Sequence, residues 1–243
     1  YNELSRRLDS DVHLIMGPWT HGANTLSYSG DVEFGIDAAI QDFHHEFHLR
    51  WFDRVLKGKR GDPMAPVQAF VMGTGDGNKD GNGRLYHGGE WREASEWPLP
   101  DTQFVPWYFH QDGTLSTDKP VGEHAPTTYL SDPDNPVPTI GGAFSSTSPV
   151  FEPGAYDQRT SPEVFGAEPP YLPLKSRSDV VVFQTAPLEN DVSVIGPVVV
   201  NLHFSSSAPD TDFTAKLVDV YPPSADFPTG FEMNITDGII RAR

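Results

Sequence analysis

The sequence predicts a short α/β region followed by a larger β-sandwich. The first sixty residues show the pattern of one strand, one loop and one amphipathic helix, in that order. After Pro66, short apolar runs with a period of two alternate with clusters of Gly, Pro, Asp and Asn, which is typical of an antiparallel sandwich. The chain contains 22 Gly and 23 Pro, yet also 15 Phe, 8 Tyr and 5 Trp. It is therefore rich in turns but has enough large side chains to fold around a core.

The first region begins with a predicted buried strand and continues with a predicted helix. Residues 12–16 form a short, mostly apolar run, and the Gly-Pro pair behind it indicates a tight loop. A helix is expected over residues 36–57, because its apolar residues recur at steps of three and four and form one stripe: Ile40, Phe43, Phe47, Trp51 and Val55. Gly58 stands where a left-handed C-cap is needed. A strand, a loop and a helix in this order are typical of an α/β domain.

The second region is expected to follow a boundary near residues 58–66, which divides the chain into domains of residues 1–60 and 61–243. Its expected strands are residues 67–72, 104–110, 127–130, 180–185, 192–195, 198–204, 214–221 and 235–242. Residues 131–175 contain many prolines and almost no periodicity, so we expect a long surface loop there.

The composition excludes several classes of function. The formal net charge of −17 argues against sequence-independent nucleic-acid binding and against docking on anionic lipid, so we expect neither nucleic acid nor membrane as a partner. The absence of cysteine excludes disulfides and a cysteine nucleophile. No apolar run approaches the ~20 residues of a membrane span, and nothing near the N-terminus resembles a signal peptide. We expect a soluble protein, with the cytoplasm favoured, and a first residue other than Met hints at a fragment.

The run Gly-Pro-Trp-Thr-His-Gly at residues 17–22 contains the candidate catalytic residue, His21. A His on a loop directly after a buried strand is where α/β-hydrolases present their general base, because its ring must reach a serine on a different strand. A loop His that caps a backbone carbonyl is the alternative interpretation.

Several motifs, spread over nearly the whole chain and in the right order, together resemble one family. They are residues 14–21, 34–35, 50–58, 71–73, 83–85, 91–92, 96–100, 132–138, 157–159, 210–217 and 237–241. The sequence is similar to the cocaine esterase / X-prolyl dipeptidyl-peptidase family, the CocE/NonD-type serine hydrolases. The resemblance implies that residues 1–60 are the C-terminal end of an α/β-hydrolase catalytic domain. Residues 61–243 would then be a jelly-roll β-sandwich of the galactose-binding-like type, truncated at its C-terminus.

The resemblance also implies a reaction, the cleavage of ester or amide bonds by a Ser-His-Asp triad. His21 would be its catalytic His, and Trp19 would line the substrate pocket or support the catalytic loop. No Gly-x-Ser-x-Gly motif occurs in the chain, so the Ser and Asp must come from a missing N-terminal catalytic segment. We expect the isolated chain to be inactive. The expected partners are a small-molecule ester or peptide substrate and the missing N-terminal and C-terminal segments, while homo-oligomerisation stays open. No cofactor and no metal are expected.

Three other interpretations remain open. Jelly rolls host many carbohydrate-binding modules, and Trp91, Trp97, Trp107 or Tyr108 could stack on sugars. His44 and His48 have helical metal-ligand spacing, although a polar flank of the helix is the simpler interpretation. Residues 76–81 match the front half of a calcium loop, but His87 stands where the loop needs its Glu, which favours a Gly-rich hairpin.

Overall fold

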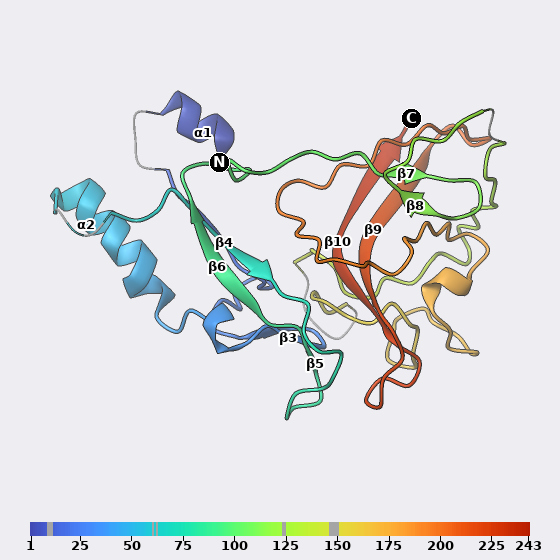
Figure 1. The fold of residues 1–243 in the computed structure, drawn as a ribbon, viewed down its shortest axis with the longest axis horizontal. Helices are drawn as coiled ribbons and strands as arrows, with labels where there is room; N and C mark the ends of the chain where they lie inside the picture. Colours follow the sequence, from blue (N-terminus) through green and yellow to red (C-terminus); the bar gives the residue numbers. More distant parts are fainter. Residues whose placement is uncertain (9–11, 60, 62, 123–124, 146–150) are drawn as a thin grey trace.

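The fold is mostly sheet, with few helices (Figure 1). The structure is a computed structural model that describes residues 1–8, 12–59, 61, 63–122, 125–145 and 151–243. Its helical segments are α1 (Asn2–Arg7), the 3-10 turn η1 (Ile36–Ala38), the π-helical turn η2 (His44–Leu49), α2 (Arg50–Lys57) and the 3-10 turn η3 (Leu174–Ser176). No helix within these ranges is long and apolar enough to cross a bilayer.

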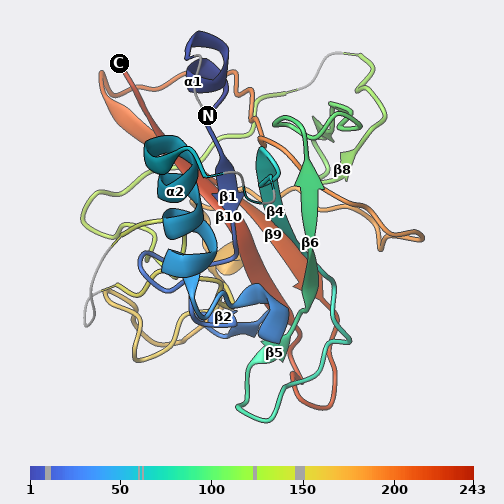
Figure 2. The same ribbon diagram turned by 90° about the vertical axis from the view of Figure 1, so that its left-hand side faces the viewer.

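The first sheet joins the two regions that the sequence analysis separated. Strand β1 (Leu14–Met16) runs parallel to β4 (Val67–Met72), with Leu14 opposite Val67. Strand β6 (Gly89–Ala94) pairs antiparallel with the other edge of β4. Parallel neighbours need a crossover connection, and α2 lies in the one that links β1 to β4. The α/β content of the described residues is this single unit, which is much less than a complete α/β-hydrolase domain. Figure 2 shows β1 and α2 on the near side, with the long C-terminal hairpin behind them.

The helix expected over residues 36–57 is wrong in its first half. After η1 the backbone of Ala39 is extended, and the amide of Ile40 donates to the carbonyl of Asn24 instead of continuing a helix. Helical structure resumes only with η2 and α2. Tertiary hydrogen bonds thus override a periodicity that favours one long helix. The C-cap prediction is confirmed: Gly58 has φ +64, and its amide donates to the carbonyl of Arg54.

The buried core lies between the N-terminal sheets and the C-terminal hairpin. A second sheet consists of β2 (Tyr28–Ser29), β3 (Val32–Glu33) and β5 (Leu85–Tyr86). The main core cluster draws on this sheet, on β4 and on the hairpin, and its members are Val32, Phe34, Ala38, Phe70, Leu85, Tyr221, Phe231 and Met233. Residues far apart in sequence are therefore held together by a shared apolar interior.

The C-terminal hairpin is the longest regular element. Strands β9 (Thr211–Tyr221) and β10 (Phe231–Ala242) pair antiparallel along their whole length (Figure 1). The strands expected at residues 214–221 and 235–242 fall inside them. Opposite charges face each other across the ladder, with Lys216 opposite Asp237 and Asp212 opposite Arg241. Such cross-strand pairs stabilise the register.

Several other expected strands are wrong. Residues 127–130, 180–185, 192–195 and 198–204 form no strand, and only Tyr108–Phe109 of residues 104–110 do, as β7 paired with β8 (Leu115–Ser116). The valines at positions 198, 199 and 200 are 48%, 67% and 47% exposed. An alternating apolar pattern produces a strand only where a neighbouring strand completes its hydrogen bonds, and the described residues bring none to this segment. Where residues 131–175 are described, they form no strand, as expected for a long loop, and η3 begins only at Leu174.

Candidate functional site

His21 lies on the loop after β1 and is exposed. Two turns shape this loop, in which the amide of Ala23 donates to the carbonyl of Thr20 and the amide of Leu26 to that of Ala23. Gly22 has φ +76, a conformation that favours glycine, and it turns the chain directly behind His21. Among the described residues the His21 ring has no hydrogen-bond partner. The structure does not show it capping a carbonyl, so its ring nitrogens are available to a substrate or to another segment.

Trp19 anchors the same loop. Its indole Nε1 donates to the carbonyl oxygen of Ala38 at 2.7 Å, and its ring lies edge-to-face with Phe43 at a centroid distance of 6.0 Å. The ring also covers Gly17, where a Cβ would come within 2.5 Å of three indole carbons. Only glycine fits under the indole without displacing it, which explains the Gly two residues before Trp19.

A hollow of about 400 Å³ opens beside His21. We call it the His21 hollow, and its walls include Ile15, Trp19, His21, Asn24, Phe43 and His48. Its volume falls within the range of small-molecule sites, and it combines aromatic walls with imidazole and amide groups.

His44 and His48 line the His21 hollow as well. Their Nδ1 atoms lie 2.9 Å apart, so one ring donates a hydrogen bond to the other. Within the described parts of the chain, no group of three or more His, Cys, Asp or Glu residues is arranged to hold a metal ion. The metal interpretation of this pair therefore gains no support from the structure.

The calcium-like segment is a tight turn whose carboxylates are already engaged. Asp76 Oδ1 accepts from the amide of Asn78, and Asp80 Oδ1 accepts from the amides of Asn82 and Arg84. The hydrogen bond from the Asn78 amide lowers the pKa of Asp76 below its usual value. These contacts support the hairpin interpretation.

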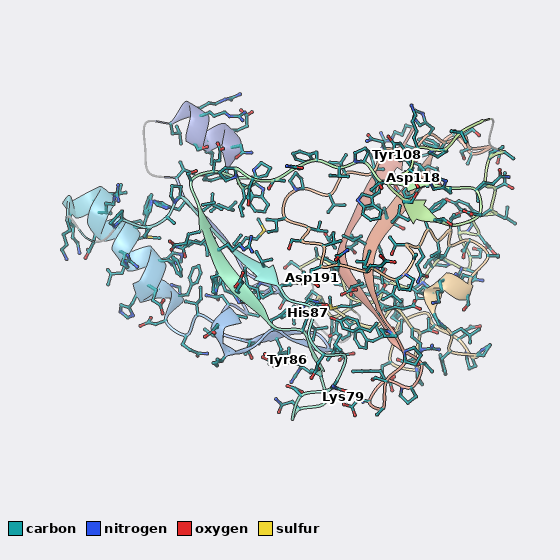
Figure 3. The ribbon with its side chains drawn as sticks, viewed as in Figure 1. Lys79, Tyr86, His87, Tyr108, Asp118 and Asp191 are labelled. Carbon is teal, nitrogen blue, oxygen red and sulfur yellow. The ribbon has the colours of Figure 1, made fainter. Side chains whose placement is uncertain are left out.

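Of the four candidate sugar-stacking aromatics, Trp91 is half-buried and packs against the core cluster. Its ring lies 5.6 Å from that of Trp19 and 5.5 Å from that of Phe70, and its Nε1 donates to the carbonyl of Asp37 at 2.7 Å. Trp97 and Tyr108 are also half-buried, and Tyr108, labelled in Figure 3, lies on β7. Trp107, which is 41% exposed, is the most accessible of the four.

Sequence reasoning missed a buried polar cluster around His87. His87 is only 3% exposed, its Nε2 lies 3.9 Å from Asp219 Oδ2, and its Nδ1 has no partner among the described residues. Tyr221 packs against it and donates its hydroxyl to the carbonyl of Thr74, and burial raises the pKa of Tyr221. Figure 3 shows His87 between the β4–β6 sheet and the hairpin. No local sequence signal marks this cluster, because its members come from β9 and from the turns around β5.

The chain matches one family model, and it is similar to known proteins in sequence and in fold. Residues 61–243 match the family model described as the X-Pro dipeptidyl-peptidase C-terminal non-catalytic domain. Cocaine esterase from Rhodococcus sp. (strain MB1 Bresler) is 37% identical over 97% of this chain, which spans 37% of the esterase. An aminopeptidase structure from a marine sediment Thaumarchaeota archaeon superposes with a TM-score of 0.64 at 23% identity. That match covers 99% of this chain and 36% of the aminopeptidase, and it shows a shared fold.

The matched segments also place the chain within the longer relatives. It spans little more than a third of the length of either relative, and the family model accounts for its residues from 61 onward. The resemblance inferred from the sequence motifs is thereby confirmed. The chain belongs to the cocaine esterase / X-prolyl dipeptidyl-peptidase family and corresponds to its C-terminal part.

Proposed function

We propose that this chain is the C-terminal part of a serine hydrolase that cleaves ester or amide bonds, and that His21 is the His of its triad. The observation that carries the proposal is the position of His21: it is exposed, it lies on the loop after β1, and it faces the His21 hollow. The relatives point the same way, because one is an esterase and another an aminopeptidase.

In this proposal His21 moves a proton twice. Its neutral imidazole accepts the hydroxyl proton as the serine oxygen attacks the substrate carbonyl, and it then donates that proton to the leaving alcohol or amine. Water repeats the cycle and releases the acyl group from the serine. The Ser and Asp precede the His along an α/β-hydrolase chain. We therefore infer that both come from polypeptide N-terminal to His21, and that the 243 residues alone do not turn over substrate.

The proposal assigns two structural roles to the chain. Residues 1–60 are the C-terminal end of the α/β-hydrolase domain, and residues 61–243 belong to the jelly roll. The order of β1, the His21 loop and α2 supports the first role, and the exposed Leu49, Phe52 and Leu56 on and beside α2 are suited to packing against the rest of that domain. The second role is supported by the β9–β10 hairpin and by the exposed valines at positions 198–200, which further strands of the jelly roll would cover.

The substrate in this proposal is a small-molecule ester or a peptide, because the aromatic walls of the His21 hollow suit an apolar acyl or amino-acid side chain. A carbohydrate-binding module is the alternative. The accessible Trp107 is the one observation that favours it, since Trp91 is already packed against Trp19 and Phe70. Binding of soluble polysaccharides that is lost in Trp107→Ala would support the alternative.

The experiment compares the full-length protein with the isolated 243-residue chain. Hydrolysis of p-nitrophenyl acetate and labelling by a fluorophosphonate are measured for both. We expect the full-length protein to turn over ester and take the label, and the isolated chain to do neither. His21→Ala in the full-length protein lowers kcat by about 10⁶-fold, as loss of a triad His does.

The matched control is His203→Ala, which removes an exposed His with no partner among the described residues. It leaves kcat unchanged. Equal activity of His21→Ala and wild type would refute the proposed role of His21. Turnover by the isolated chain would refute the requirement for an additional segment.

A further inference from the structure

Two tryptophans from distant parts of the chain bind the same short turn. Trp19 Nε1 donates to the carbonyl of Ala38, and Trp91 Nε1 donates to the carbonyl of Asp37, each at 2.7 Å. Both carbonyls belong to η1, which ends at the extended residue Ala39. The last carbonyls of a helical turn have no partner within the turn, so the two indoles supply it.

The two indoles also touch each other. Their ring centroids lie 5.6 Å apart at an interplanar angle of 49°. Trp19 and Trp91 are thus joined twice, once by ring contact and once through neighbouring peptide units of η1. If the Trp91 side chain moves, the Trp19 ring loses one of the ring contacts that hold it in place.

Trp91 is itself held by the sheet and the core. In the β4–β6 ladder it lies directly opposite Phe70, and the two rings are edge-to-face with a centroid distance of 5.5 Å. Phe70 is buried and packs edge-to-face with Phe34 in the main core cluster. The indole of Trp91 therefore has little freedom to move. Through its contact with Trp19, it holds the Trp19 ring at a fixed place relative to the core.

Trp19 is in turn two residues from His21 and lies flat over Gly17 at the start of the same loop. Its other ring neighbour, Phe43, is next to the π-helical turn η2. We propose that Trp91 is a positioning residue for His21. It holds Trp19 against η1, so that the catalytic loop presents the imidazole in one orientation. This inference rests on the proposed function, in which His21 is the general base.

The inference assigns a role in the reaction to a residue inside the segment that matches a family model described as non-catalytic. Trp91 lies within residues 61–243, yet its neighbours Trp19 and Asp37 lie outside them. The C-terminal region in this inference does more than pack against the catalytic domain. It sets the position of the general base.

The test uses the full-length enzyme with p-nitrophenyl acetate as substrate. Trp91→Phe keeps an aromatic ring but removes the N–H, and it lowers kcat about fivefold, the cost of one net hydrogen bond. Trp91→Ala removes the ring contacts as well and lowers kcat about 100-fold through misplacement of the base. KM stays within about twofold in both, because substrate binding does not use the orientation of the imidazole. Phe104→Leu, a change at an exposed aromatic residue of the same region, leaves both constants unchanged.

A double-mutant cycle with His21→Ala distinguishes an effect of Trp91 through His21 from a general effect on the fold. If Trp91 acts through His21, Trp91→Phe causes no further loss of residual activity in the His21→Ala background. An equal fold-loss in the two backgrounds overturns the inference while the proposed function survives. Full activity of His21→Ala alone overturns both. If Trp91→Ala does not fold, as judged by its thermal transition, Trp91→Phe carries the test by itself, and unchanged kcat in that variant overturns the inference.

Discussion

Residues 28–99 and residues 175–220 have similar apolar patterns but different fates in the folded chain. The first segment contributes most of the buried residues, among them Val32, Val67 and Leu85, each with no exposed surface. None of residues 175–220, all of which the structure describes, is buried. The difference shows that burial here depends on available partners more than on hydrophobicity. The first segment packs within the N-terminal sheets and against Tyr221, Phe231 and Met233 of the hairpin. Most valines of the second segment, such as Val194, Val199 and Val220, are exposed.

The largest expected effect tests the core side of this comparison. Met233 is fully buried in the main core cluster, so Met233→Ala removes its contacts and leaves a cavity. We expect a loss of about 2–5 kcal/mol in the free energy of unfolding. The measurement is urea unfolding of the 243-residue chain. The matched variant is Val199→Ala, at 67% exposure, which changes the free energy of unfolding of this chain by less than about 0.5 kcal/mol. An equally large loss in both variants would show that burial does not account for the difference between the two segments.

An effect of intermediate size is expected in the His21 loop, where Trp19 lies over Gly17. In Gly17→Ala the new Cβ would lie 2.5 Å from the Trp19 ring, so the indole or the loop must move. Overpacking of this kind costs about 1–3 kcal/mol. If His21 has the proposed role, Gly17→Ala in the full-length protein should also lower the rate of ester hydrolysis, whereas Gly81→Ala, where a Cβ meets nothing within 4 Å, should not. Identical behaviour of the two variants in thermal unfolding and in turnover would mean that Trp19 does not lie over Gly17.

The smallest expected effect concerns Lys216 in the hairpin. Burial lowers the pKa of Lys216 below its usual value, and Asp237 Oδ2 at 3.9 Å compensates only in part. The ammonium group of Lys216 holds its proton more tightly in the unfolded chain than in the folded chain. Lys216 therefore destabilises the fold while it is charged. Stability therefore rises with pH from the lowered folded-state pKa up to the ordinary value of 10.5. Lys216→Met should abolish that rise in urea titrations at alkaline pH. A steeper increase of the unfolding free energy with pH in Lys216→Met would contradict the lowered pKa of Lys216.

Much of the fold could be predicted where interacting residues are close in sequence or where the apolar pattern is strong. The strand at residues 67–72 matches β4, the two hairpin strands lie within β9 and β10, and the Gly58 cap is as expected. The prediction of a strand at residues 198–204 is wrong. The apolar pattern indicates that the side chains suit a sheet, but it does not indicate whether a neighbouring strand is available. The break between η1 and η2 was missed, because it depends on the Asn24 carbonyl and on two indole donors from elsewhere.

The candidate site was partly predictable for the same reason. His21 could be identified from the local pattern of strand, Gly-Pro turn and Trp, and its role stays a prediction. The contact between Trp19 and Trp91 could not be identified, because nothing near Trp91 in the sequence indicates that its ring faces the His21 loop. The cluster of His87, Asp219 and Tyr221 likewise forms only when the hairpin packs against the β4–β6 sheet.

The parallel ladder between β1 and β4 constrains how this protein can be recombined with its relatives. An exchange of C-terminal modules cut between residues 60 and 61 would place β1 and the His21 loop from one parent beside β4 and Trp91 from the other. Such a chimera must rebuild both a strand pairing and an indole contact across its seam. A crossover point C-terminal to β6 would inherit the whole three-stranded sheet from one parent, which makes it the safer junction for engineered hybrids.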